Sequence, residues 1–498
     1  MTDKKTQAEK EAELLERVQD GLYIGGQWRP ASDGETLDVF DPATGEKLKT
    51  IADAAVEDGV AAVDAAAAAF PAWSATAPRT RADILRRAFD MVIERTEDFA
   101  LLMTIEMGKP LEEARGEVTY GAEFLRWFSE EAVRIEGRYG PNPENTGRMI
   151  ITKHPVGPAF LITPWNFPLA MATRKIAPAL AAGTTVIVKP AALTPLTTIY
   201  LAQIFEEAGL PPGVLNVIAT SRSVAVSADI IDHPDLRKLS FTGSTPVGQQ
   251  LLKQAANGVL RTSMELGGNA PFIVFEDADL DAAVEGAIQA KFRNIGQACT
   301  AANRFIVARP IAEEFIRRVN EQVEAMKIGR GTDETVRIGP LINKGAVEKT
   351  LALVADAKNR GASIKIGGLE IPGPGSFVEP TVIGDVAPDS DILKEEIFGP
   401  VLAVVPFDTE EEAVNFANST DYGLVSYAYT KDLARAQRLV ETLHTGMMGL
   451  NTGLVSNAAA PFGGWKKSGL GREGGHEGIE EYLQTKYTLT ANPFTVVK

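Results

Sequence analysis

The chain has 498 residues, of which 45% are hydrophobic and 23% are charged, as expected for a globular protein with two large domains. Its formal net charge of −16 repels phosphate backbones and anionic lipid surfaces, so we expect neither a nucleic acid nor a membrane partner. Cys299 is the only cysteine, which excludes an intrachain disulfide and the usual cysteine-based zinc sites, and we expect no metal site.

The first twenty residues are charged throughout and lack the apolar stretch of a signal peptide or a membrane anchor. The least charged long stretch, 155–173, contains four prolines, which would leave backbone groups unsatisfied in lipid. Together with the single cysteine, these features predict a protein of the reducing cytoplasm.

Residues 50–130 have a strongly helical pattern, and from about residue 155 short β-branched runs alternate with helical segments. This alternation predicts a parallel sheet covered by helices on both faces, and dinucleotides commonly bind at the carboxyl ends of such strands. The expected strands are 159–163, 184–188, 214–218 and 238–242, and the expected helices are 171–182, 197–208 and 221–231.

A second alternating region runs from residue 270 to about 430 and predicts a second α/β domain. Its expected strands are 272–275, 304–308, 363–367 and 401–407, with a helix over 311–326 that begins after Pro310. The fold class is therefore α/β with two open parallel sheets.

Cys299 lies in FRNIGQACTAANRF, a polar segment that contains a glycine and predicts a loop. A free cysteine is often an inert small hydrophobe, but polar neighbours and a glycine would let a substrate approach the thiol, so both interpretations stay open. A nucleophilic thiol needs a base or another way to favour the thiolate. Glu265, before the glycine pair of MELGGNAPF, is one candidate; no histidine lies in a recognisable protease-like context, the four being His154, His233, His444 and His476.

The segment FTGSTPVG, residues 241–248, follows a predicted strand and precedes a helical segment. A turn of this kind can hold a phosphate at the helix N-terminus. It is neither the usual dinucleotide-binding fingerprint nor a P-loop, so by itself it is weak evidence for a nucleotide.

Seven motifs in order, from about residue 22 onward, resemble those of the NAD(P)-dependent aldehyde dehydrogenases: TPWNFPL (163–169), VKPA (188–191), FTGST (241–245), MELGGNAP (264–271), GQACTAANR (296–304), EEIFGPV (395–401) and PFGGWKKSGLGRE (461–473). The resemblance implies two Rossmann-like domains, a cofactor-binding domain (1–131 and 154–263) and a catalytic domain (264–450). It also implies a return segment at their interface (451–479) and a small β oligomerisation element (132–153 and 480–498), hence a homodimer or homotetramer.

The same resemblance assigns roles to individual residues. Cys299 would attack the aldehyde, Asn166 and the Cys299 backbone N–H would hold the oxyanion, and Glu265 would activate the water that hydrolyses the thioester. Lys189 would hold the adenosine ribose, Gly243 and Ser244 the pyrophosphate, and Glu396 the nicotinamide ribose, with Trp165 and Leu266 lining the cleft. Ala192 stands where many NAD-preferring members carry glutamate, so we expect NADP, with NAD as the alternative.

Three further positions, Arg174, Arg293 and Ser456, resemble the carboxylate-binding set of the succinate semialdehyde dehydrogenases. They predict oxidation of succinate semialdehyde to succinate; another ω-carboxylated aldehyde, such as glutarate or 2-oxoglutarate semialdehyde, is the alternative, because two arginines do not fix the chain length. A plainer interpretation makes them surface arginines in salt bridges.

Ala301 replaces the second cysteine that some members carry, so no regulatory disulfide can form there. A nonenzymatic scaffold and a cofactor-free thiol hydrolase are the competing classes.

Overall fold

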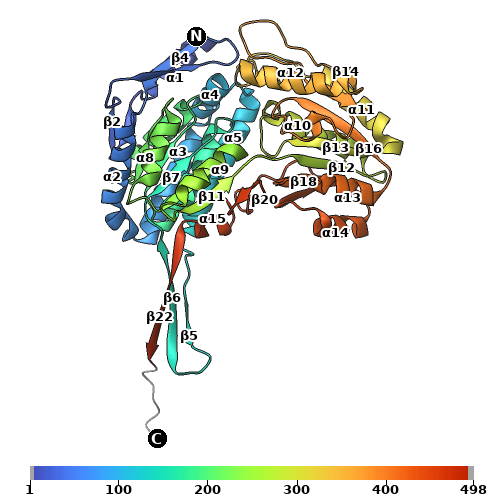
Figure 1. Ribbon diagram of the computed structural model, residues 1–498. Coiled ribbons are helices and arrows are strands. Elements are labelled where there is room, and N and C mark those ends of the chain that lie inside the picture. The colour runs from blue at the N-terminus through green and yellow to red at the C-terminus, as the bar shows by residue number, and fades with distance from the viewer. Residues whose placement is uncertain (1–4, 492–498) are drawn as a thin grey trace.

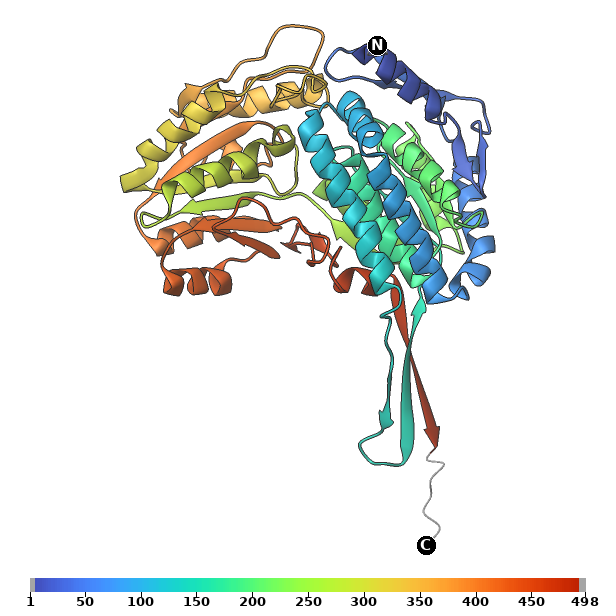
Figure 2. The ribbon, with the colours of Figure 1, turned by 180° about the vertical axis from the view of Figure 1, so that it is seen from behind.

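The computed structural model describes residues 5–491, which form two lobes side by side and an arm that projects from one of them (Figure 1; Figure 2). Each lobe is built on one of two large sheets, and the predicted α/β fold is confirmed. Among the described residues, no helix is both long enough and apolar enough to cross a bilayer.

The sheet of the first lobe has the strand order β2-β1-β9-β8-β7-β10-β11-β21. Its central strands, from β9 to β11, run parallel, and β1, β2 and β21 add antiparallel edges. The strands are β1 (Leu22–Ile24), β2 (Gln27–Arg29), β7 (Ala159–Ile162), β8 (Val186–Lys189), β9 (Leu215–Val217), β10 (Lys238–Thr242), β11 (Arg261–Glu265) and β21 (Gly469–Leu470).

Helices cover both faces of this sheet, as the continuous apolar strands require. Successive side chains of a strand point to opposite faces, so Leu161 packs in the core shared with α3 to α7, whereas Phe160 packs with α2 and α8. The helices are α2 (Val56–Ser74), α3 (Pro78–Glu94), α4 (Thr96–Met107), α5 (Leu111–Glu131), α6 (Pro168–Ala182), α7 (Leu196–Glu207), α8 (Ser223–Asp232) and α9 (Thr245–Ala255).

The second sheet has the order β14-β15-β16-β13-β12-β18-β19 and is parallel except for its edge strand β14. Its strands are β12 (Ala270–Val274), β13 (Ala302–Ala308), β14 (Ser363–Ile366), β15 (Thr381–Gly384), β16 (Val401–Phe407), β18 (Val425–Tyr429) and β19 (Met447–Leu450). Its helices are α10 (Leu280–Phe292), α11 (Arg309–Glu324), α12 (Lys344–Asn359), α13 (Glu410–Asn418) and α14 (Leu433–Thr442).

The arm is a three-stranded antiparallel ribbon of β5 (Arg138–Pro141), β6 (Gly147–Pro155) and β22 (Leu483–Ala491), in the order β22-β6-β5. It joins the predicted hairpin near 132–153 to the predicted C-terminal strand; residues 492–498 of that prediction lie outside the described residues. The N-terminal part adds α1 (Gln7–Arg17), β3 (Thr36–Phe40) and β4 (Lys47–Ala52), none of which was expected from the sequence.

Candidate active site

The loop that carries Cys299 is strained and tightly packed. After α10 the chain forms a short 3₁₀ turn, Arg293–Gly296, in which Asn294 (φ 54°) and Ile295 (φ 59°) adopt left-handed conformations. Gly296 (φ 73°) follows, and a Cβ there would lie 2.3 Å from the carbonyl oxygen of Gly399, so only glycine fits. The predicted loop at Cys299 is therefore present, and the residues packed around it restrict its backbone to one conformation.

The Cys299 thiol is free and half-buried. Burial raises the pKa of Cys299 to about 12, and the positive charges of Arg174 and Arg293 oppose that rise. The thiol is therefore protonated at neutral pH in this structure, and a nucleophilic role requires a base that removes its proton.

Cys299 lines a cavity of about 280 Å³ at the junction of the two lobes. Most residues that the sequence marked for catalysis and cofactor binding share this cavity: Trp165, Asn166, Gly243, Ser244, Glu265, Leu266 and Glu396. The cavity also brings in Met171, Thr242, Lys349 and Phe398, which were not assigned from the sequence.

Asn166 lies in the turn between β7 and α6 and is 4% exposed. Its side-chain Nδ2 donates a hydrogen bond to the carbonyl of Gln297, at 2.9 Å, two residues before Cys299. An amide NH₂ has two hydrogens, so a second donor is left for an oxygen that develops charge in the cavity.

Glu265 ends strand β11 and is 3% exposed. Neither of its carboxylate oxygens has a hydrogen-bond partner among the described residues. Burial and, after it, the negative charge of Glu473 raise the pKa of Glu265 well above its ordinary value. A carboxylate in this state is a stronger base than one in water and suits proton abstraction.

A buried ionic cluster lies close enough to Glu265 to affect its pKa. Glu473, in the segment after β21, pairs with Arg174 Nε and Lys175 Nζ of α6, both at 2.5 Å. The Arg174 guanidinium lies 4.1 Å from the ring centroid of Phe462. Both cationic side chains are 0% exposed, so the interpretation of Arg174 as a surface residue is wrong. Glu473 ends the last sequence motif and Lys175 lies outside the motifs, and nothing in the sequence distinguished either residue from a solvated charge.

The three residues of the expected carboxylate set are not joined by any hydrogen bond or ion pair between described groups. Arg293 is half-buried, with its guanidinium 5.4 Å from the ring centroid of Phe167, and Ser456 is half-buried in the stretch that follows β19. The positive charges of Arg174 and Arg293 both lower the pKa of the Cys299 thiol, yet neither arginine lines the cavity at Cys299. The carboxylate set stays a prediction.

The residues expected at the dinucleotide lie at the carboxyl ends of β8 and β10. The Lys189 Nζ donates to Ser223 Oγ at 3.1 Å, and burial lowers the pKa of Lys189 to about 8. Ser244 is the exposed N-cap of α9 and makes no capping bond with its side chain. A Cβ at Gly243 would lie 2.5 Å from the Phe241 ring, so a larger residue there would have to displace that ring.

Glu396 and Phe398 come from the motif EEIFGPV and face the same cavity. Burial raises the pKa of Glu396 to about 7, and its carboxylate accepts a hydrogen bond from the Gly268 N–H at 3.2 Å. Phe398 (φ 53°) packs edge-on against Trp165, with 5.5 Å between ring centroids. Ala192 instead lines a separate groove with Leu193, Asn343 and Lys344.

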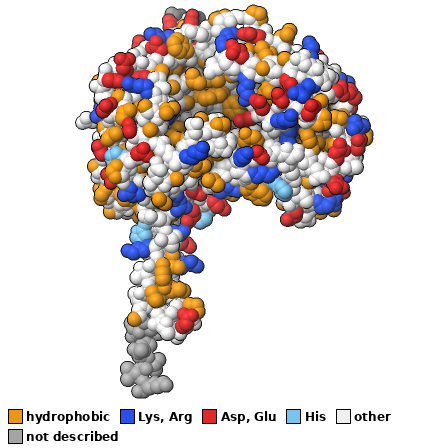
Figure 3. All heavy atoms as spheres, viewed as in Figure 1, with side chains coloured by type: hydrophobic (Ala, Val, Ile, Leu, Met, Phe, Trp, Pro, Cys, Tyr) orange, Lys and Arg blue, Asp and Glu red, His pale blue; other side chains and the backbone are white. Residues whose placement is uncertain are grey.

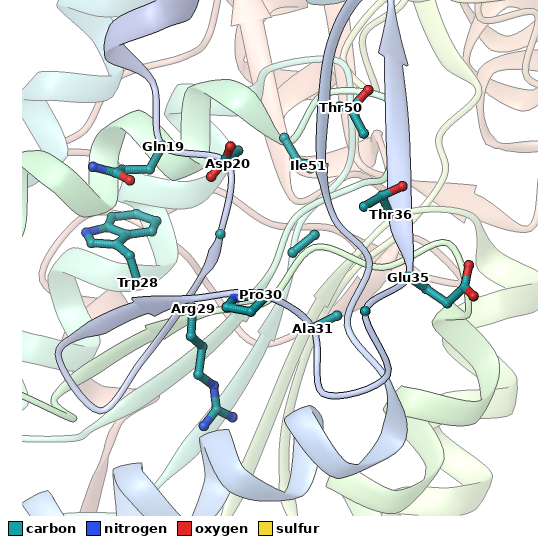
Figure 4. A pocket seen from close by; sticks show the side chains of 13 residues that line it. Gln19, Asp20, Trp28, Arg29, Pro30, Ala31, Glu35, Thr36, Thr50 and Ile51 are labelled. Atoms are coloured by element: carbon teal, nitrogen blue, oxygen red, sulfur yellow. The ribbon is translucent and has the colours of Figure 1, made fainter.

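A cavity of about 460 Å³ elsewhere in the molecule is lined by residues 19–52, among them Trp28, Arg29 and Glu35 (Figure 4). It contains none of the candidate site residues, so the smaller cavity at Cys299 is the one with the chemistry.

A family model described as "Aldehyde dehydrogenase family" matches residues 28–488. The chain belongs to this family. It is 58% identical over 447 residues to a succinate-semialdehyde dehydrogenase of Paenarthrobacter nicotinovorans, a match that covers 90% of this chain and 99% of the relative. These values confirm the resemblance that the ordered motifs indicated.

Two further relatives have similar coverage. The chain is 47% identical to the succinate-semialdehyde dehydrogenase [NADP(+)] GabD of Escherichia coli, over 93% of this chain and 96% of the relative. It is 48% identical to a glutarate-semialdehyde dehydrogenase of Pseudomonas aeruginosa, over 96% and 98%. The crystal structure of an aldehyde dehydrogenase from Brucella melitensis biovar abortus 2308 superposes with a TM-score of 0.94, at 47% identity and 99% coverage of both chains.

Proposed function

We propose that this aldehyde dehydrogenase family member oxidises an aldehyde with a distal carboxylate, succinate semialdehyde first, to the corresponding acid with NADP or NAD. One observation carries the proposal: a free thiol, a buried carboxylate without a partner and an amide donor line a single cavity. A scaffold gains nothing from a buried, unpartnered carboxylate, which costs free energy.

In the proposed reaction, Glu265 takes the proton of the Cys299 thiol, and the sulfur attacks the aldehyde carbon. The carbonyl electron pair moves to oxygen, and the resulting oxyanion accepts hydrogen bonds from the Asn166 amide and the Cys299 backbone N–H. When bound, the nicotinamide supplies the hydride acceptor that oxidises the carbon. Glu265 passes the thiol proton to solvent and is a carboxylate again. It then takes a proton from water, whose oxygen attacks the thioester carbon; the C–S bond breaks, the Cys299 sulfur takes that proton back from Glu265, and the acid is released.

The residues present fit a dinucleotide. The open N-terminus of α9, with Ser244 exposed and Gly243 without a Cβ, suits a pyrophosphate. Lys189 is a buried cation with no carboxylate partner among the described side chains, as a ribose or ribose-phosphate site requires. Ala192 carries no charge to repel a 2′-phosphate, which supports NADP, and the Escherichia coli relative is named for NADP.

The cofactor choice is tested by Ala192→Glu, which adds a carboxylate near the ribose. We expect the KM for NADP to rise at least tenfold while the KM for NAD changes little, because a carboxylate repels the 2′-phosphate. Ala192→Gln is the matched control without charge. An equal rise for both cofactors would contradict the placement of Ala192.

An anionic substrate is supported by Arg293, whose positive charge acts on the Cys299 thiol and which forms no ion pair with a described carboxylate, whereas Arg174 is already paired with Glu473. The named relatives act on succinate or glutarate semialdehyde, which both carry a carboxylate. Glutarate semialdehyde is therefore the second candidate.

The test is a comparison of kcat/KM for succinate semialdehyde, glutarate semialdehyde and neutral hexanal, each with NADP and NAD. A charged hydrogen bond is worth about 1.5 to 3 kcal/mol, so Arg293→Ala should lower kcat/KM for the carboxylated aldehydes roughly 10- to 150-fold and leave hexanal unchanged. A preference for hexanal, with no effect of Arg293→Ala, would refute the carboxylate pocket but not the dehydrogenase.

The division of labour follows from the same proposal. The sheet of residues 154–263, with helices from 1–131, would bind the cofactor; residues 264–450 would carry Cys299, and 451–479 would return to the interface. Hydrophobic side chains are visible on the arm (Figure 3), and the exposure of Tyr139, Tyr487 and Leu489 supports the proposal that the arm binds a second copy of the chain. Sedimentation should therefore give a dimer or tetramer, and cell fractionation tests the predicted cytoplasmic location.

A further inference from the structure

Helix α5 carries two acidic residues one turn apart. Glu117 bonds to the start of α6, next to the Asn166 turn, and Glu113 bonds to the loop that leads to Cys299. Glu117 Oε1 accepts hydrogen bonds from the backbone N–H groups of Leu169, at 3.0 Å, and Ala170, at 3.1 Å. These are first-turn groups of α6, whose own N-cap, Phe167, offers no side-chain acceptor. Glu117 therefore caps the helix that begins directly after the Asn166 turn.

Lys109, between α4 and α5, completes this arrangement. Its Nζ donates to the other oxygen of Glu117 and, at 2.9 Å, to the backbone carbonyl of Asn166. The same ammonium group lies 4.1 Å from the ring centroid of Phe167. Lys109 is 1% exposed, and these contacts all fall on Glu117 and on the turn that presents Asn166.

The opposite side of the site is tied to the same helix. The backbone N–H of Asn294 donates to Glu113, and its Nδ2 donates to the carbonyls of Asn166, at 3.0 Å, and Gln297, at 2.9 Å. Asn166 in turn donates to the Gln297 carbonyl. The turn of Asn166 and the loop of Cys299 are thus bonded to each other and, through Lys109, Glu117 and Glu113, to α5.

We propose that Lys109 and Glu117 are positioning residues that fix the Asn166 amide relative to the Cys299 sulfur. A buried ion pair recovers the cost of its desolvation poorly and is seldom needed for stability alone. Here both charges are fully buried and their contacts are to the backbone and ring of one catalytic turn. A displacement of about 1 Å at such a turn is enough to slow a reaction on the order of 100-fold. The proposal rests on the proposed role of Asn166 as oxyanion donor.

The chain offers a matched control in Glu106, at the end of α4. Its carboxylate is also fully buried and caps a different helix, α7, through the N–H groups of Leu196, at 2.8 Å, and Thr197, at 2.9 Å. No proposed catalytic residue lies on that turn of α7. Glu106→Gln therefore weakens a buried helix cap without touching the Asn166 turn.

The test measures the rate constant of the first-turnover NAD(P)H burst, the cofactor KM and the thermal midpoint for Lys109→Met, Glu117→Gln and Glu106→Gln in the full-length enzyme. We expect the burst to slow 10- to 100-fold in the first two variants with the cofactor KM unchanged, and to stay within twofold in Glu106→Gln. Lys109→Arg, which keeps the charge, should recover part of the rate and supplies a folded variant if Glu117→Gln does not fold. Equal slowing in Glu106→Gln and Glu117→Gln, at equal loss of midpoint, would make the role merely structural.

A double-mutant cycle separates this proposal from the proposed function. If Lys109 acts through Asn166, Lys109→Met should slow the burst less than threefold further in an Asn166→Ala background, because the two effects are not additive. A full 10- to 100-fold effect in that background would overturn the positioning role. Asn166→Ala without any effect on the burst would instead refute the oxyanion donor itself.

Discussion

Two carboxylates of the first lobe, each close to proposed catalytic residues, are equally buried and differently used. Glu117 and Glu265 are each 3% exposed. Glu117, on α5, accepts hydrogen bonds from two backbone N–H groups and from Lys109. Glu265, at the end of β11, accepts no hydrogen bond from the described groups and has a raised pKa.

The difference shows that the hydrogen-bond partners of a buried glutamate decide whether it holds neighbouring residues in place or acts as a base. Hydrogen bonds to a carboxylate stabilise its charged form and immobilise it, whereas burial without partners makes it take up a proton more readily. In the proposed mechanism, Glu117 therefore helps to fix where the reacting groups lie, and Glu265 is the group that changes protonation state.

Cys299→Ala should have the largest effect, because it removes the nucleophile itself. We expect NAD(P)H production to fall by about four orders of magnitude or more. The half-buried thiol makes no hydrogen bond with the described groups, so circular dichroism and the thermal midpoint should not change. Turnover that persists in this variant would refute the proposed mechanism.

Asn166→Ala tests the amide that bonds the turn before α6 to the loop of Cys299. Loss of one oxyanion donor typically costs 100- to 1,000-fold in kcat, and the Asn166 amide is the donor that the cavity offers. The burst of NAD(P)H should slow by that factor, with little change in the cofactor KM. A change of less than threefold would remove Asn166 from the chemistry.

The pH dependence of kcat tests the cause of the raised pKa of Glu265. The base must be deprotonated to act, so activity rises with pH through its pKa. Because the negative charge of Glu473 raises that pKa, Glu473→Gln should move the acidic limb to lower pH. A limb that stays in place or moves to higher pH would show that Glu473 does not act on Glu265. Lys153, paired with Glu480 at the base of the arm, supplies the control variant Lys153→Met, which should leave the limb unmoved.

The stability of two conservative variants provides the smallest expected effect. Glu106→Gln weakens a partnered cap and should lower the free energy of unfolding by about 1 to 3 kcal/mol. Glu265→Gln removes a desolvated charge without partners and should leave it unchanged or raise it. Urea midpoints measured in parallel decide this, and a large loss in Glu265→Gln would show that its carboxylate has partners after all.

Much of the fold followed from the sequence, because strands such as β7, β8 and β13 are short, mainly apolar runs whose burial on both faces leaves a clear pattern. Strand β11 was missed because its sequence, RTSME, is polar. It becomes a strand by pairing with β10 on one side and with β21, some 200 residues later, on the other. Local pattern cannot report such a partner.

The candidate site divides in the same way. Cys299, Glu265 and Asn166 belong to motifs whose order identifies the family, so the sequence alone is enough to name them. Lys109 and Glu117 could not be named in this way, since the contact of Lys109 with Asn166 spans 57 residues and that of Lys175 with Glu473 spans 298. In the sequence these residues look like charges of a solvated helix.

The most direct test of the central claim is a single-turnover experiment with Glu265→Gln. If Cys299 forms a thioester that only Glu265-activated water can release, the variant should produce NAD(P)H, more slowly than the wild type, up to one equivalent per active site and then stop. Mass spectrometry should find the acyl group on the peptide that contains Cys299. Continued turnover at the wild-type rate, or an acyl group absent from Cys299 after the burst, would contradict the account.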